Sequence, residues 1–116
     1  MIVKRGDIVN VQFPKGEIVE GTRPSIIVSN DIANRFSPFI QVIPIVSIIQ
    51  KAKLPVHLEL PQEKYKQLFK DSVAVTEKTT AIRKEWLQPM ILGTLDNEDI
   101  EKLNKMIQIQ FGLVEI

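Results

Sequence analysis

The sequence predicts a mostly β protein in which several short strands form a small, curled sheet closed by one C-terminal helix. Short alternating or β-branched runs fill the first two thirds of the chain, and a single helical pattern follows at its end. The chain has 116 residues, and no repeat, low-complexity tract or Gly/Ser linker divides it. We therefore expect a single domain covering residues 1–116.

Alternation and turn residues predict the first two strands. Residues 7–13 alternate between apolar and polar side chains, and Pro-Lys-Gly follows at 14–16 as a turn. The second apolar run covers residues 25–29. It is preceded by Gly-Thr-Arg-Pro, in which proline fixes φ. Arg23 is therefore expected at the mouth of the second strand, on a stiff segment.

The third strand is expected to be buried. Residues 30–38 are rich in turn formers and predict a polar connection. Residues 39–49 are nearly all apolar and mostly β-branched, which favours a buried strand over a helix. Pro44 within this run indicates a sheet edge or a bulge.

Two further strands and a short helix are predicted before the tail. Residues 55–60 alternate, with His57 on the outward face, where solvation is more common than catalysis. Pro61 favours the first turn of a short helix over residues 61–69. Residues 71–76 form another strand candidate.

The C-terminal helix has the clearest pattern. Asp96 is a suitable N-cap, and acidic residues in the first turn suit the positive end of the helix dipole. Gly112 lies where a C-terminal cap is expected. The apolar residues recur at helical spacing: Ile100, Leu103, Ile107 and Phe111.

The composition excludes several classes of chemistry. The chain has no cysteine and one histidine, so disulfide scaffolds, zinc fingers, thiol enzymes and histidine-based metal sites are not expected. No metal site and no cofactor are predicted. Catalysis would have to use Arg, Lys, Asp, Glu, Ser, Thr or the one histidine.

Charge is distributed unevenly along the chain. Residues 1–84 carry 13 Lys or Arg against 8 Asp or Glu, a net charge of +5, whereas residues 85–116 carry 2 against 6, a net charge of −4. A basic body can attract a phosphate backbone, and ordinary solvated surface is the alternative interpretation. No apolar stretch is long enough to cross a bilayer, and we expect a soluble, cytoplasmic protein.

Arg23 and Ser47 are the first candidates for a functional site. The planar guanidinium of Arg23 fits a phosphate group with two hydrogen bonds, although a surface ion pair with Glu20 or Asp31 would also account for it. Ser47 interrupts an apolar strand near its end. Its hydroxyl either bonds a neighbouring carbonyl or points into a pocket.

The chain resembles the MazF/PemK family of toxin endoribonucleases, most closely the branch from Gram-positive bacteria. The order and spacing of five segments together carry this resemblance. They are Lys4-Arg5-Gly6-Asp7, Gly21-Thr22-Arg23-Pro24, Asn30-Asp31-Ile32-Ala33-Asn34-Arg35-Phe36-Ser37-Pro38, Gln50-Lys51-Ala52-Lys53-Leu54-Pro55 and Lys70-Asp71-Ser72-Val73.

The resemblance implies a fold and an activity. The fold would be a compact, SH3-like β-barrel of the CcdB/PemK type with a C-terminal helix. The protein would be the toxin of a type II toxin–antitoxin system: a homodimer that cuts single-stranded RNA at specific sequences without a metal ion. A MazE-like antitoxin would silence it.

The resemblance also implies site residues. Arg23 matches the arginine of the Gly-x-Arg-Pro motif, and Val46 stands where the family has a threonine. Valine keeps the shape of threonine but lacks its hydroxyl. Ser47 is adjacent, and because neighbouring strand residues point to opposite faces it substitutes only if a bulge or twist re-aims it. We take Arg23 and Ser47 as catalytic candidates.

Other residues are expected to contact RNA. The hairpin before Gly-x-Arg-Pro holds Ile18, Val19 and Glu20 where the family is polar, and the family's Glu-Gln-x-Arg segment reads Glu77-Lys78-Thr79-Thr80. Phe36 and Phe39 are suited to base stacking, core packing or a dimer interface. The predicted RNA-binding residues are Lys15, Thr22, Arg35, Phe36, Lys51, Lys53, Glu77 and Lys78.

Three functional hypotheses follow. The first is a sequence-specific endoribonuclease toxin that uses the 2′-hydroxyl of its substrate as nucleophile. The second is a catalytically weakened module of the same fold that binds RNA or an antitoxin-like peptide without cleavage. The third is a protein-interaction module that does not bind RNA, because fold alone does not determine function.

Overall fold

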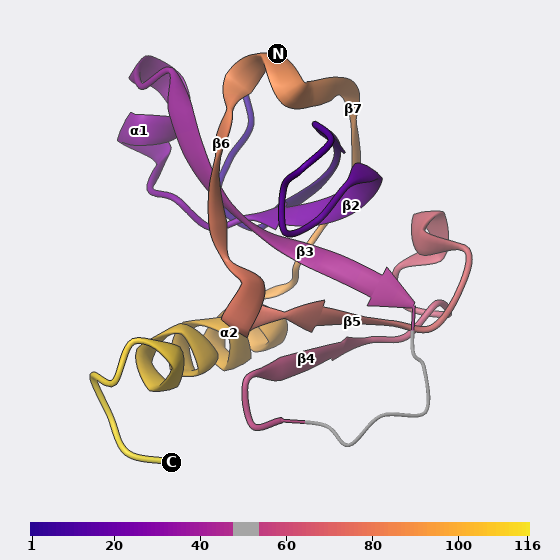
Figure 1. Ribbon diagram of the computed structural model, residues 1–116. Coiled ribbons are helices and arrows are strands. Elements are labelled where there is room, and N and C mark those ends of the chain that lie inside the picture. The colour runs from indigo at the N-terminus through magenta and orange to yellow at the C-terminus, as the bar shows by residue number, and fades with distance from the viewer. Residues whose placement is uncertain (48–53) are drawn as a thin grey trace.

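One antiparallel sheet makes up most of the molecule in the computed structural model, and the longer helix packs against it (Figure 1). The structure describes residues 1–47 and 54–116. Its strands are β1 (Asp7–Phe13), β2 (Gly21–Ile27), β3 (Phe39–Ser47), β4 (His57–Leu60), β5 (Ser72–Val75), β6 (Thr80–Arg83) and β7 (Leu87–Thr94). The helices are α1 (Asp31–Phe36) and α2 (Asn97–Gln110), with short 3₁₀ turns η1 (Lys66–Leu68), η2 (Thr76–Lys78) and η3 (Lys84–Trp86).

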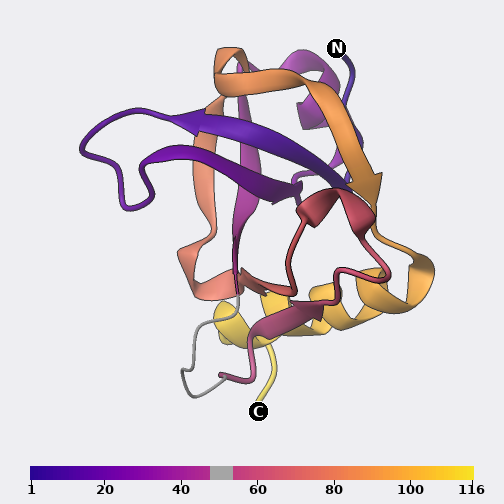
Figure 2. The same cartoon turned by 90° about the vertical axis from the view of Figure 1, so that its right-hand side faces the viewer.

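The sheet is strongly curled. Its strand order is β4-β5-β3-β2-β1-β7, and β6 pairs with the first part of β3. In the described part of the chain no ladder joins β4 to β7, so hydrogen bonds do not close the barrel. The predicted fold class, mostly β with a C-terminal helix, is confirmed. Figure 2 shows the β1–β2 hairpin extending beyond the rest of the sheet.

Each face of the sheet has its own hydrophobic core. On one face Ile26, Ile43 and Ile45 are buried together with Leu103 of α2. On the other face the curled strands enclose a second cluster that includes Val11 and Val42. Successive strand residues point to opposite faces, so alternation decides which core each residue enters.

The helix α2 forms as the sequence predicts. Asp96 is its N-cap, and the carboxylate oxygen Oδ1 accepts a hydrogen bond of 2.9 Å from the backbone N–H of Asp99. Leu103 is fully buried against the sheet. Past the C-terminal end, Gly112 has φ of 71°, and the N–H of Leu113 bonds the carbonyl of Gln108 at 2.8 Å. Glycine adopts this left-handed conformation without steric cost, which is why it follows the helix.

A polar cluster attaches the start of α2 to the segment after β4. The Lys64 ammonium nitrogen lies 2.7 Å from Oδ2 of Asp96 and 2.9 Å from Oδ2 of Asp99. The Tyr65 hydroxyl donates to the same oxygen of Asp99, which is buried. Two donors therefore satisfy a carboxylate that would otherwise be costly to bury.

Two predictions in the connections are wrong. Residues 30–38 contain helix α1, because the Asn30 side chain accepts a 2.9 Å hydrogen bond from the backbone of Ala33 and so acts as an N-cap. Residues 61–69 form only turns and η1. The backbone leaves the helical region at Tyr65, where φ is −118° and ψ is 77°, and Phe69 has a left-handed φ of 64°.

Pro44 lies inside the central strand and marks neither a sheet edge nor a bulge. Along one side of β3, β6 pairs with Phe39–Val42 and β5 pairs with Ile45–Ser47. Ile43 and Pro44 lie between these two ladders and pair with neither strand, so no partner on this side requires the missing proline N–H. The predicted strand continued to residue 49, and residues 48 and 49 lie outside the described part of the chain.

The sequence pattern predicts no strands at the positions of β6 and β7.

None of the helices in the described part of the chain is long and apolar enough to cross a membrane.

The polar cluster predicts how stability depends on pH. The hydrogen bond from Lys64, followed by that from the Asp99 N–H, lowers the pKa of Asp96. Hydrogen bonds to Asp96 and Asp99 raise the pKa of Lys64, and burial raises the pKa of Tyr65. The Asp96 contribution is therefore lost as the pH falls below about 4, and the Lys64 and Tyr65 contributions are lost above about 10.

We expect the midpoint of urea unfolding to be level between about pH 5 and pH 9 and to fall on both sides. Asp96→Asn is the matched variant, because asparagine caps a helix equally well but does not titrate. Below about pH 5 its unfolding midpoint should fall less steeply with decreasing pH than that of the parent protein. A fall of equal steepness would contradict the role given to Asp96.

Candidate functional site

Strand register places Arg23, Val46, Val73, Glu59 and His57 on one face of the sheet. Val46 is paired with Val73, and Val73 is paired with Glu59, so these three side chains form a row across β3, β5 and β4. His57 is two residues from Glu59 and shares its face. Arg23 is opposite Val11 and shares the face of Val11 and Val42. We call this surface the Arg23 face.

The Gly-x-Arg-Pro segment explains why Arg23 is accessible. Gly21 has φ of 79°, a conformation that favours glycine where the hairpin loop enters β2. Pro24 lacks an N–H, and the β2–β3 ladder extends only from Ile27 to Ser25. The Arg23 side chain is exposed and forms no ion pair or side-chain hydrogen bond with another described residue.

Val46 and Ser47 point in opposite directions. The β3–β5 register runs from Ile45 to Ser47 without interruption, so no bulge re-aims Ser47. Ser47 therefore projects on the side of buried Ile45, at the exposed end of the strand. Continuing the β2–β3 register by two residues brings Arg23 level with Val46. Val46, which lacks a hydroxyl, therefore lies on the face of Arg23, and the hydroxyl of Ser47 lies on the other face.

His57 and Glu77 form a pair beside this face. The His57 nitrogen Nε2 lies 3.0 Å from Oε1 and 2.9 Å from Oε2 of Glu77, and the histidine side chain is only 14% exposed. The other ring nitrogen, Nδ1, accepts a 3.2 Å hydrogen bond from the Leu54 N–H. The expectation of a solvated His57 is therefore wrong, because η2 brings Glu77 to it.

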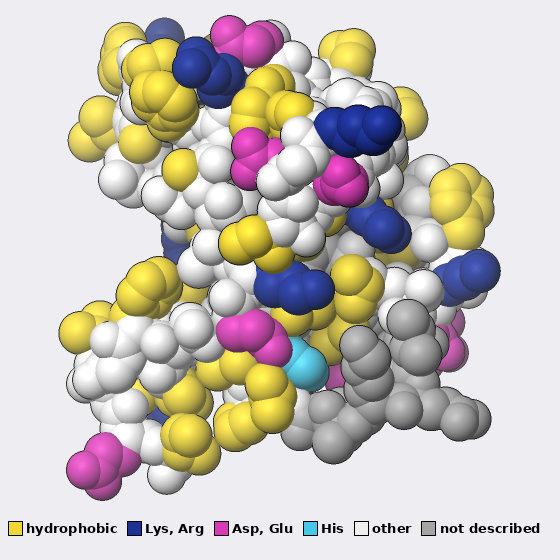
Figure 3. Space-filling model, viewed as in Figure 1, with side chains coloured by type: hydrophobic (Ala, Val, Ile, Leu, Met, Phe, Trp, Pro, Cys, Tyr) yellow, Lys and Arg dark blue, Asp and Glu magenta, His cyan; other side chains and the backbone are white. Residues whose placement is uncertain are grey.

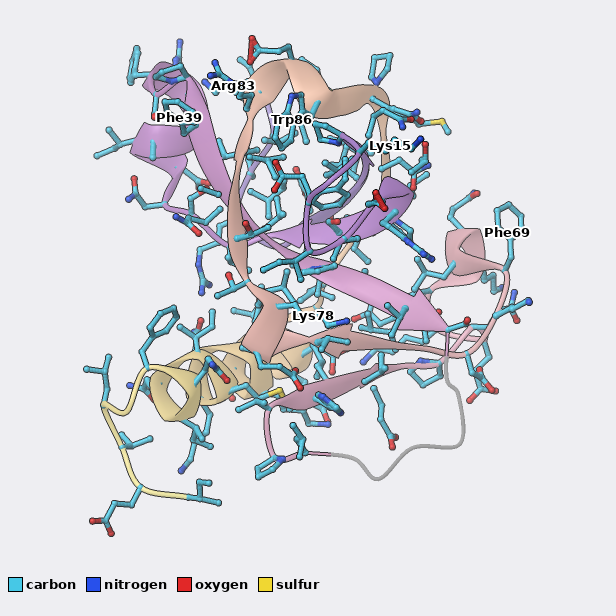
Figure 4. All side chains as sticks on the ribbon, in the orientation of Figure 1. Lys15, Phe39, Phe69, Lys78, Arg83 and Trp86 are labelled. Atoms are coloured by element: carbon cyan, nitrogen blue, oxygen red, sulfur yellow. The ribbon has the colours of Figure 1, made fainter. Side chains whose placement is uncertain are left out.

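Lys78 borders a small cleft beneath the hairpin loop (residues 14–20). The loop contributes Glu17, Ile18 and Val19 to this cleft, and Trp86 contributes from η3. Figure 4 labels Lys78 beside the start of β6 and Lys15 on the hairpin loop. Figure 3 shows basic and acidic side chains mixed on this side of the molecule.

Several predicted RNA-binding residues do not join this face. Thr22 alternates with Arg23 and points to the other side of β2, where its hydroxyl donates to the Gln12 side-chain oxygen. Arg35 and Phe36 belong to α1, which lies beside the opposite end of β3 from Ser47 (Figure 1). Lys51 and Lys53 lie outside the described residues.

The structure brings together residues that sequence reasoning missed. Glu59 and Val73 share a row with Val46, although the sequence pattern predicts only that each belongs to a strand. Alternation within each predicted strand indicates which residues share a face, but the pairing of strands is not visible in the pattern. No group of three acidic or histidine side chains in the described ranges is arranged to hold a metal ion.

A family model for the PemK-like, MazF-like toxin of type II toxin–antitoxin systems matches residues 4–111. The chain belongs to this family. The match includes every described residue of the Arg23 face, so the family assignment and the site concern the same segment of the chain.

Relatives and solved structures agree with the MazF/PemK assignment. The chain is 39% identical over 117 residues to endoribonuclease EndoA of Bacillus subtilis, covering 99% of each chain. It is 35% identical to endoribonuclease MazF of Staphylococcus saprophyticus, covering 97% of this chain and 93% of the relative. MazF of Deinococcus radiodurans has the same fold, with a TM-score of 0.78 at 17% identity over 97% of this chain and 98% of that one.

The Mycobacterium tuberculosis toxin MazF-mt6 also has this fold, with a TM-score of 0.77 at 20% identity over 94% of this chain and 99% of that one. Likenesses at this level of identity establish the fold.

The His57 contacts predict the tautomer of the ring. Because Nδ1 accepts a hydrogen bond from the Leu54 N–H, the proton of the neutral ring lies on Nε2 and points to Glu77. Long-range ¹H–¹⁵N spectra should therefore show the Nε2–H form, and the signal needs no assignment because the chain has one histidine. Glu77→Gln is the control, since its amide oxygen still accepts. A dominant Nδ1–H form would contradict the described contacts.

Proposed function

We propose that this MazF/PemK toxin is an endoribonuclease that cleaves single-stranded RNA without a metal ion, with Arg23 as the electrostatic catalyst. The observation that carries the proposal is the exposed guanidinium of Arg23, which has no ion-pair or hydrogen-bond partner among the described residues. Relatives at 39% and 35% identity that carry the name endoribonuclease support it.

The chemistry requires a donor for developing negative charge. The substrate 2′-hydroxyl attacks phosphorus, the bond to the 5′-oxygen breaks, and the products are a 2′,3′-cyclic phosphate and a 5′-hydroxyl. Negative charge builds on the phosphoryl oxygens in the transition state. A guanidinium fixed on a strand and aimed at those oxygens stabilises that charge without reorganisation. Glu59 and Glu77 are the carboxylates on or beside this face that can accept a proton.

One observation favours a second candidate function, a module that binds RNA or an antitoxin-like peptide without cutting. Val46 lies on the same face of the sheet as Arg23 and carries no hydroxyl, and the Ser47 hydroxyl projects from the other face. A site with the guanidinium but without the neighbouring hydroxyl retains its attraction for phosphate or carboxylate. Ser47 as a catalytic residue would require β3 to twist on substrate binding.

The proposal also includes an oligomeric state, a cellular location and an inhibitor. We propose a homodimer of single-domain chains in the cytoplasm, where RNA is available. A MazE-like antitoxin is the proposed inhibitor. A Mycobacterial endoribonuclease of the same fold was solved in complex with its cognate antitoxin, with a TM-score of 0.76 at 17% identity over 98% of this chain and 99% of that one.

Arg23→Ala tests the catalytic role. With mixed-sequence RNA in excess EDTA, the parent protein should produce cyclic-phosphate ends, and the variant should lose about a hundredfold to a thousandfold in rate. Arg23→Lys is the matched control: it keeps the charge but loses the planar pair of donors, and it should recover only part of the rate. Equal rates for parent and Arg23→Ala would refute the proposal, and binding without cleavage by the parent would favour the second function.

Val46→Thr tests whether the missing hydroxyl limits the reaction. The change keeps side-chain volume and places a donor and acceptor level with Arg23, so the cleavage rate should rise about tenfold or more. Val46→Ala is the control, because it adds no hydroxyl and should not raise the rate. An unchanged rate in a folded Val46→Thr protein would mean that this position does not limit catalysis.

A further inference from the structure

Two arginine–phenylalanine pairs lie where α1, β3 and β6 meet. The Arg35 guanidinium carbon is 5.6 Å from the centroid of the Phe36 ring, and that of Arg83 is 5.5 Å from the centroid of the Phe39 ring. Phe39 and Arg83 are directly opposite each other in the β3–β6 register. Figure 4 shows this second pair at the upper left. We call these four residues the Arg–Phe corner.

The corner is accessible and positively charged. Phe36 is 76% exposed and Phe39 is 48% exposed, and both arginines are exposed. Neither arginine forms an ion pair with a carboxylate in the described ranges. The charge of each guanidinium is therefore available to a ligand, and each ring keeps a large solvent-exposed surface.

The strand β6 connects this corner with the candidate active site. Lys78, at the end of η2, borders the cleft beneath the hairpin loop. The strand β6 begins two residues later and spans about 10 Å from Thr80 to Arg83. Among the described strands only β3 pairs with β6. No described strand covers the other edge of β6, and Ala81 between the two basic residues is exposed.

We propose that β6 and the Arg–Phe corner form a second contact for the single-stranded RNA, outside the place of cleavage. The proposal rests on the endoribonuclease function proposed above. Exposed rings stack on unpaired bases regardless of sequence, and arginines beside them neutralise the adjoining phosphates. The absence of a described carboxylate partner for either arginine favours a polyanion over a second protein surface.

Binding of uncleavable RNA tests this second contact. Strands of 2′-O-methyl RNA lack the nucleophilic hydroxyl, and two lengths are compared, about 20 and about 6 nucleotides, on either side of typical single-strand site sizes. Arg35→Gln/Arg83→Gln should weaken binding of the long strand roughly tenfold and reduce its log K against log salt slope by about 1.4, as expected for two lost phosphate contacts. Phe36→Ala should weaken the same strand roughly tenfold through lost stacking.

The matched control is Lys102→Gln/Lys105→Gln, which removes two positive charges from the exposed side of α2. It should change long-strand affinity less than twofold, and the corner variants should leave the short strand unaffected. Equal losses for control and corner variants, or equal losses for both strand lengths, would overturn the second contact. A corner variant that dissociates a dimer in sedimentation equilibrium would also overturn it, because the corner would then lie between two copies.

These outcomes separate the two proposals. If the corner variants bind the long strand as the parent does while Arg23→Ala abolishes cleavage, the second contact is wrong and the endoribonuclease function stands. If the parent protein binds neither strand and cuts no RNA, both proposals fail together.

Discussion

The register of β3 is the constraint on which the rest of the structure depends. This strand pairs with β2 on one side and with β6 and then β5 on the other. Its alternation sends Ile43 and Ile45 into the core beneath α2 and Val42 into the opposite core. Because this strand contributes side chains to both cores, a shift of one residue would exchange them between the two cores and disrupt the packing of both. The direction of Val46 is fixed by the same packing.

Polar contacts of two kinds surround this framework. Around Asp99 the donors of Lys64 and Tyr65 satisfy a buried carboxylate and attach α2 to the chain after β4. On the Arg23 face the Arg23 guanidinium is exposed and has no partner among the described residues, so its charge is available to a ligand. Satisfied polar groups stabilise a fold, whereas an unsatisfied but solvated guanidinium costs little and retains its capacity to bind.

The sequence predicts elements better than it predicts how they are paired. The alternation of β1, the apolar run of β3 and the capped periodicity of α2 each carry a local signal, and each element forms. The sequence pattern around Asn30 does not distinguish a turn from a helix start, because asparagine favours turns and N-caps alike. The segment after Pro61 lacks a helix because Tyr65 is directed to Asp99, a contact between residues 34 positions apart. No local pattern contains that contact.

The candidate site shows the same limit. The motif around Arg23 predicts a stiff segment at the mouth of the second strand, whereas the structure places Arg23 inside β2. The pairing of His57 with Glu77 depends on how β4, β5 and η2 are assembled, and alternation within one strand does not reveal it. The position of Pro44 could not be predicted for the same reason. The central strand accommodates a proline there because a gap separates the β3–β6 and β3–β5 ladders on that side of β3.

The direction of Ser47 also restricts how this chain can evolve. A deletion or insertion of one codon early in β3 would turn the serine toward Arg23, but it would also turn Ile43 and Ile45 out of the core beneath α2 and toward the opposite core, which is packed around other side chains. Forcing the wrong side chains into a packed core typically costs about 1–3 kcal/mol, a large share of the stability of a small domain. Substitution at position 46 carries no such penalty. Mutational routes to a hydroxyl on this face therefore pass through the codon for Val46 and not through the serine already present beside it.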